Sequence, residues 1–184
     1  MESLKTELHC HNIFSNGHVG TLEPIYDCNV TISKQLEQAY LAGLDVLFVT
    51  NHNTIDGYRQ MLEYKKNHQK FDALNVYPAE EVTTDNESHV LVYGIDHSIK
   101  SGLSLHEILD EAKKQDAVTV APHPFSLMDA LREDSTYCDL FEVFNSCNVD
   151  VYSNLRAKKF AKEKLLHVVA GSDSHVQSTV GRST

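Results

Sequence analysis

The sequence contains no apolar run long enough to cross a membrane. Its longest apolar stretches, residues 46–49 and 117–121, are far shorter than the roughly 20 residues that a membrane-spanning helix requires. The N-terminal residues do not combine a charged start with an apolar signal region. We therefore expect a cytoplasmic protein without a membrane partner.

Cysteine motifs, linkers and internal repeats are absent as well. The four cysteines are widely spaced and form no C-x-x-C pair, which argues against a zinc ribbon and against a thioredoxin-like redox site. No Pro/Gly/Ser-rich linker divides the chain. A length of 184 residues with 41% apolar residues suffices for one well-buried core. We expect reduced thiols and a single domain over residues 1–184.

The sequence also lacks a stripe of basic residues. The 16 Lys and Arg are not clustered, and the formal net charge is −10. Proteins that bind duplex nucleic acid neutralise phosphates with such a stripe, so duplex nucleic acid is not an expected partner. The acidic excess is consistent with ordinary solubility, and also with acidic side chains that bind cations.

Short runs of strand-forming residues alternate with segments of helical periodicity. The expected strands cover residues 4–9, 44–50, 74–82, 89–93, 117–121, 140–144 and 167–170. The expected helices cover residues 32–42, 55 to about 68, 105–115 and 151–164. Ser104 and Glu107 form a capping-box pattern, and Gly43 fits the position just after a helix. This alternation predicts an α/β fold with a largely parallel sheet.

Candidate metal ligands stand at or near the ends of these expected strands. They are His9, His11, His52, Glu80, Glu81, His89, His123, Asp173 and His175. Residues at the carboxyl ends of many parallel strands meet at one face of a barrel, whereas an open sheet has its site at one switch point. Because at least five strand ends carry candidate ligands, we favour a barrel.

Local patterns support metal binding by several of these residues. His9 and His11 are two apart on an expected strand, so both imidazoles face the same side. Imidazole is a common ligand of transition metals. Two adjacent carboxylates at positions 80 and 81 would be costly to bury without a cation or hydrogen bonds. His123 lies between two prolines that restrict the backbone around its ring.

The ordered series resembles the polymerase and histidinol phosphatase (PHP) superfamily of metal-dependent phosphoesterases. The H-x-H-x-x-x-S-D-G motif of that family corresponds to residues 9–17, T-D-H to 50–52, G-x-E to 79–81, H-P to 123–124 and G-x-D-x-H to 171–175. His89 matches the single histidine before an apolar strand. The resemblance covers essentially the whole chain and implies a distorted (β/α)7, TIM-like barrel of the PHP fold.

The resemblance also implies two to three divalent metal ions at the barrel mouth. The first would be held by His9, His11, Glu81 and Asp173, the second by Glu81, His89 and His123, and the third by His52, His175 and the residue at the S-D-G position, which is Asn16 here. An asparagine oxygen carries no charge, and Asn51 likewise replaces the aspartate of T-D-H. We therefore expect a third metal that is weak or absent, unless His18 supplies a ligand.

The implied activity is hydrolysis of a small phosphomonoester or nucleotide by a metal-bound hydroxide. Glu81, Asp173 and His175 are the residues expected to take part most directly in catalysis. Zinc, manganese and iron all suit a mixed histidine and carboxylate site. Two alternatives remain open: a catalytically weak metal-binding module with a regulatory or scaffolding role, and a nuclease or polymerase-associated editing domain. The sequence ends nine residues after His175, so a barrel truncated at its C-terminus is also expected.

Overall fold

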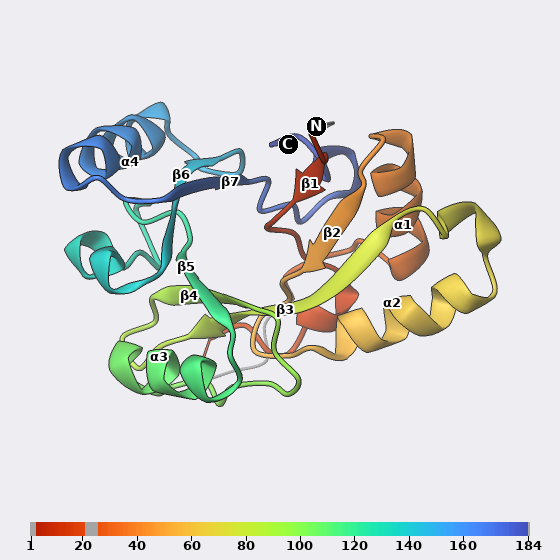
Figure 1. Cartoon of the computed structure of the whole chain (residues 1–184), viewed down its shortest axis with the longest axis horizontal. Coiled ribbons are helices and arrows are strands. Elements are labelled where there is room, and N and C mark those ends of the chain that lie inside the picture. The colour runs from red at the N-terminus through yellow and green to blue at the C-terminus, as the bar shows by residue number, and fades with distance from the viewer. Residues whose placement is uncertain (1–2, 21–25, 184) are drawn as a thin grey trace.

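Seven strands pair in the order in which they occur along the chain and curve around a common centre (Figure 1). The computed structural model describes residues 3–20 and 26–183. The strands are β1 (Thr6–Glu7), β2 (Val46–Val49), β3 (Asn75–Thr83), β4 (His89–Tyr93), β5 (Val118–Ala121), β6 (Leu140–Asn145) and β7 (Val168–Gly171). Each corresponds to one of the seven strands expected from sequence.

Strand β4 runs antiparallel to both of its neighbours, and the other four strand pairs are parallel. The short turn between β3 and β4 explains this direction, since a parallel connection needs a crossover of about a dozen residues or more. The hydroxyl of Thr84 lies 2.8 Å from that of Ser88 and stabilises the turn. The sheet is therefore mixed but largely parallel, as predicted.

The segments that follow β1 and β7 bring the two edges of the sheet together. The backbone N–H of Asp173 donates to the carbonyl of His9 over 2.7 Å, and that of His11 donates to the carbonyl of Ser174 over 3.0 Å. The buried carboxylate of Glu7 accepts bonds from the N–H groups of Ser172 and Gly181. These contacts nearly close the barrel at the end where the candidate ligands gather.

The four expected helices are present within one or two residues of their predicted bounds. They are α1 (Ile32–Leu41), α2 (Asp56–Lys66), α3 (Leu105–Lys114) and α4 (Val151–Lys164). The capping box of Ser104 and Glu107 is formed, and Gly43 follows α1 with a φ of +66°. Short 3-10 turns, η1 (Ile13–Ser15), η2 (Gln69–Phe71), η3 (Arg132–Tyr137) and η4 (Gln177–Thr179), complete the described elements.

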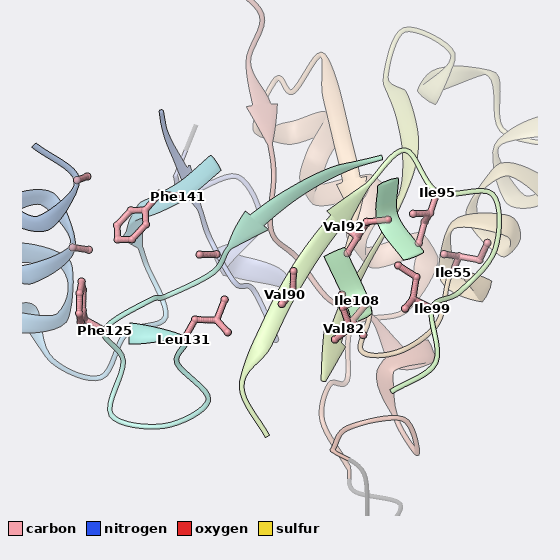
Figure 2. Close-up of a cluster of buried hydrophobic side chains, with 14 residues drawn as sticks. Ile55, Val82, Val90, Val92, Ile95, Ile99, Ile108, Phe125, Leu131 and Phe141 are labelled. Atoms are coloured by element: carbon pink, nitrogen blue, oxygen red, sulfur yellow. The ribbon is translucent and has the colours of Figure 1, made fainter. Parts of the chain in front are cut away.

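Apolar side chains pack between the outer face of the sheet and the helices. Figure 2 shows one such cluster, in which Val82 and Val90 of the β3–β4 hairpin lie near Ile108 of α3. Phe125 and Phe141 extend the same cluster toward α4. Burial of each such side chain contributes about 1.5–3 kcal/mol. Within the described part of the chain, no helix is both long and apolar enough to cross a bilayer.

Candidate metal centre

The segment after β1 directs two imidazoles into the barrel. His9 and His11 are fully buried and share one side of the chain, as predicted. Cys10, between them, points the other way: its thiol lies 3.3 Å from the carbonyl of Phe48, and it packs in the apolar cluster beneath α1. The alternation of an extended chain therefore separates the two imidazoles from the thiol.

Glu81 lies at the centre of the site, with its two carboxylate oxygens facing different histidines. Its Oε2 is 3.3 Å from both His9 Nε2 and His11 Nε2 and 3.5 Å from His52 Nδ1. Its Oε1 is 3.2 Å from His89 Nδ1 and 3.1 Å from His123 Nε2. One buried carboxylate thus joins residues from β3, β4 and the ends of β1 and β5.

Asp173 completes a first group of four potential ligands. Its Oδ1 is 3.4 Å from His9 Nε2 and 3.2 Å from His11 Nε2. The ligand atoms of His9, His11, Glu81 and Asp173 all lie within 4.8 Å of one another. Asn145, at the end of β6, donates a 3.1 Å hydrogen bond to the other oxygen of Asp173. These four residues are the first set that the family resemblance implied.

A second group shares Glu81 with the first. His52, Glu81 and His89 have ligand atoms within 4.8 Å of one another. His123 adjoins them, with its ring centre 5.6 Å from that of His89. The resemblance implied Glu81, His89 and His123 here, and the structure brings those three together with His52 beside them.

A third group includes Asp27, which the sequence analysis missed. Asp27, His11, His52 and His175 have ligand atoms within 4.8 Å of one another. The Oδ1 atom of Asp27 is 3.0 Å from His175 Nε2 and 3.8 Å from His52 Nε2. Asp27 belongs to no periodic segment or motif, so the sequence offered no signal for it.

Asn16, which the resemblance implied as a ligand of the third metal, has its side chain bonded to the backbone. Its side-chain oxygen accepts hydrogen bonds from the backbone N–H groups of Asp27 and Cys28, and its amide donates to the carbonyl of Cys28 over 2.9 Å. With these bonds made, both polar ends of the side chain are turned to the backbone. His18 is exposed and is outside the three ligand groups among the described residues.

Asn51 has a structural role at the end of β2. Its side-chain oxygen accepts hydrogen bonds from the backbone N–H of Asn12 and the hydroxyl of Ser15, and its amide donates to Asn12. Since the Ser15 hydroxyl donates to Asn51, it accepts the proton of His11 Nδ1, 3.2 Å away. The Nε2 lone pair of His11 is thereby left facing Glu81 and Asp173.

Glu142 orients His9 in a similar way, and sequence reasoning assigned it no function. Its Oε1 lies 3.2 Å from His9 Nδ1, and its Oε2 accepts hydrogen bonds from the His123 backbone and the Asn145 side chain. The available signal was a lone carboxylate within the otherwise apolar run of β6. Carboxylates that accept the second N–H of a metal-binding histidine are common supports of metal sites.

The ionisable groups influence one another strongly. Burial alone would raise the pKa of Glu81, but the neighbouring His89 and His9 hold that pKa well below its usual value. Burial lowers the pKa of His52 to about 3. For His175, burial alone would lower the pKa, but hydrogen bonds to Asp27 and Cys147 and the charges of Asp173 and Asp27 together raise it to about 12. Glu81 and Asp173 therefore stay ionised, and their negative charge favours the binding of cations.

Several buried nitrogens of the site lack an aligned hydrogen-bond partner. They are Nε2 of His9 and His11, and Nδ1 of His52, His89 and His123. Buried polar atoms are normally paired, and the first four of these nitrogens point toward carboxylates at 3.2 to 3.5 Å without forming hydrogen bonds. The histidine and carboxylate donors therefore fit a group of divalent transition-metal ions.

A cavity of about 310 Å³ opens onto this cluster. Its polar lining includes Asp27, Glu81, Asp173 and the imidazoles of His52, His89, His123 and His175. Its rim includes Leu127, Met128 and Val149, whose exposed fractions are 70%, 72% and 89%. The cavity is large enough for a small molecule.

Known proteins resemble the chain over most of its length. An uncharacterized protein of Methanocaldococcus jannaschii, MJ1587, is 32% identical over 165 residues, which are 87% of this chain and 93% of that protein. Residues 151–184 match the family model described as PHP-associated.

Two solved structures share the fold at low sequence identity. A proposed metal-dependent phosphoesterase from Bifidobacterium adolescentis has a TM-score of 0.69 at 16% identity, over 96% of this chain and 90% of that one. The lesion-specific endonuclease Q of Pyrococcus furiosus has a TM-score of 0.66 at 16% identity, and the match covers 96% of this chain but only 49% of that enzyme. These structures show the fold. With the ordered motifs, the identity to MJ1587 over most of the chain and the PHP-associated family match show that the chain belongs to the PHP superfamily.

Proposed function

We propose that this protein is a metal-dependent hydrolase of small phosphomonoesters. The observation that carries the proposal is the position of Glu81, whose two oxygens face two separate pairs of histidines at 3.1 to 3.3 Å. A carboxylate shared in this way suits two neighbouring cations. Two-metal sites of this kind are typical of enzymes that cleave phosphoesters.

The residues that would hold the cations follow from the geometry. His9, His11, Glu81 and Asp173 would hold one, and Glu81 with His89 and His123 would hold another. His52 belongs to both the second and the third group. When bound, such cations supply a water acidic enough to react near neutral pH and positive charge beside the phosphoryl oxygens.

The surrounding residues fix the protons of the ligands. Glu142 accepts the Nδ1 proton of His9, and Ser15 accepts that of His11, so each Nε2 lone pair is directed toward Glu81. His175 donates its Nδ1 proton to the carbonyl of Asp173, 2.9 Å away. Because these tautomers are set before a substrate arrives, little rearrangement is needed for catalysis.

The cavity favours a substrate with one phosphate group. Among the described residues that line it there are carboxylates but no lysine or arginine. A phosphate would therefore be attracted through the cations and imidazoles of the cluster, and a second phosphate outside the cluster would find no lysine or arginine. The apolar rim of Leu127, Met128 and Val149 suits an uncharged organic group on the ester oxygen.

The same features argue against the two alternatives. Endonuclease Q acts on DNA, but this chain spans only about half of that enzyme, and its net charge of −10 does not favour a long polyanion. The proposed ligands of the first two groups are all present and converge, which does not favour a catalytically weak module.

A substrate screen tests this proposal. The full chain would be freed of metal with a chelator, loaded separately with zinc, manganese or iron, and assayed on phosphomonoesters, a phosphodiester and short single-stranded DNA. We expect metal-dependent release of phosphate from monoesters, abolished in Glu81→Gln. Cleavage of DNA or of the diester without monoester hydrolysis would contradict the proposal.

A further inference from the structure

We infer that Asp27, rather than the residue at position 16, supplies the carboxylate ligand of a third divalent cation, which His52 and His175 also bind. The inference deepens the proposed function, on which it rests in requiring cations at the same cluster. It also reverses the sequence-based expectation of a weak or absent third metal, because that expectation assumed Asn16 to be the ligand.

Asn16 serves as a clamp on the backbone beside Asp27. Its oxygen accepts from the N–H of Asp27 over 2.7 Å and from that of Cys28 over 3.0 Å, while its amide donates to the carbonyl of Cys28 over 2.9 Å. An aspartate at position 16 could accept the two N–H bonds but could not donate the third. Asparagine therefore suits a residue that positions this loop, whereas a charged oxygen suits a ligand.

The clamp presents the carboxylate of Asp27 to two imidazoles from distant parts of the chain. The Oδ1 atom lies 3.0 Å from His175 Nε2 and 3.8 Å from His52 Nε2. The Asp27 side chain is only 9% exposed, and its buried Oδ2 has no hydrogen-bond partner. A simple ion pair with His175 would explain the position of Oδ1. It would not explain why Oδ2 is buried without a hydrogen bond, or why His52 Nε2 lies near the same carboxylate.

The ring nitrogens of both histidines that face Asp27 can bind a cation at this position. His175 donates its Nδ1 proton to the carbonyl of Asp173, so the lone pair of a neutral ring lies on Nε2, which faces Asp27. His52 is almost fully buried, and its Nε2 faces the same carboxylate. Two imidazoles and one carboxylate, beside an open cavity, form a ligand set typical of zinc or manganese.

Counting bound metal tests this inference without relying on activity. The metal-free full chain and its variants would be equilibrated with zinc or manganese, desalted and measured by elemental mass spectrometry, and then titrated with cobalt while the visible spectrum is recorded. We expect about three equivalents in the natural sequence, one for each ligand group, and about one fewer in Asp27→Asn. Asp110→Asn, the same change on the exposed face of α3, should leave the count unchanged.

Asn16→Ala provides a second variant that leaves Asp27 in place. Loss of a supporting residue typically weakens metal binding about 10- to 100-fold, so the weakest cobalt step should shift by that factor while the tighter steps stay unchanged. Circular dichroism of the metal-free variants separates loss of a ligand from loss of the fold. If Asp27→Asn folds poorly, the cobalt titration of Asn16→Ala tests the third site instead.

The outcomes separate this inference from the proposed function. The third site would be ruled out if Asp27→Asn still bound three equivalents of metal, or if the natural sequence bound only two. Either result would leave the proposed hydrolase activity unaffected. If the weakest cobalt-binding step of Asn16→Ala has the same affinity as in the natural sequence, Asn16 does not position Asp27 for metal binding. No bound metal in any variant would overturn both.

Discussion

Glu142 supports His9 from the side opposite to Glu81. Its Oε1 lies 3.2 Å from His9 Nδ1, while Glu81 Oε2 lies 3.3 Å from His9 Nε2. One histidine ring thus links a carboxylate that sets its tautomer to a carboxylate that shares its proposed metal. His9 can bind a cation through Nε2 only while Nδ1 keeps its proton.

Replacement of Glu142 by glutamine should weaken metal binding without unfolding the protein. The variant keeps the shape of the side chain but has one oxygen for the three groups that the carboxylate now serves: His9 Nδ1 and the N–H donors of His123 and Asn145. We expect the affinity for zinc to fall about 10- to 100-fold. Competition with a chelating dye measures this change, and an unchanged affinity would show that Glu142 does not position His9.

Gly171 should not tolerate even a methyl group. A Cβ atom at this position would lie 2.2 Å from Glu142 Oε1 and 2.4 Å from the Cβ atom of His9. In Gly171→Ala, one of these residues must therefore move, at a cost of about 1–3 kcal/mol. We expect lower stability in urea together with reduced metal content. A variant with the stability and metal content of the natural sequence would contradict the packing described for this position.

Glu80 should make the stability of the metal-free protein depend on pH. Burial raises the pKa of this side chain from 4.5 to about 7, although hydrogen bonds from the backbone N–H of Ile99 and the side chain of Ser98 favour the charged form. The unfolded chain ionises first, so stability is lost as the pH rises from 4.5 to about 7, and the loss is complete above that range.

Glu80→Gln removes this buried charge and can still accept the bond from Ile99. The variant should be more stable than the natural sequence at pH 8 by on the order of 2 kcal/mol and nearly equal to it at pH 4.5. Urea unfolding in the presence of a chelator measures both values. Glu63→Gln, on the exposed surface of α2, is the matched control. A stability difference that does not change between the two pH values would show that the pKa of Glu80 is the same in the folded and the unfolded protein.

The apolar rim should favour esters with apolar leaving groups. Leu127 lines the cavity, whereas Leu41 on α1 is comparably exposed, at 67%, and does not line it. Leu127→Ser should raise KM for naphthyl phosphate about fivefold, which corresponds to about 1 kcal/mol of lost apolar contact, with little change in kcat. Leu41→Ser should change neither value. Equal effects of Leu127→Ser on naphthyl phosphate and glycerol phosphate would argue against a leaving-group site at the rim.

Sequence alone predicted the parts of this protein that follow regular patterns. The seven strands and four helices followed from periodicity, and the convergence of His9, His11, Glu81 and Asp173 followed from the rule that strand ends meet at one face of a barrel. Asp27 could not be predicted in this way because it lies in an irregular loop, where no period indicates direction. The contacts of Asn16 with the backbone at 27 and 28 likewise depend on the folded path of that loop.

The central claim is that Glu81 holds two cations between two sets of histidines. Elemental mass spectrometry of the purified natural sequence beside Glu81→Ala tests it most directly. The account predicts about two or more equivalents of zinc, manganese or iron in the natural sequence and loss of most of this metal in the variant. Substoichiometric metal in the natural sequence after reconstitution, or a metal content that does not depend on Glu81, would contradict it.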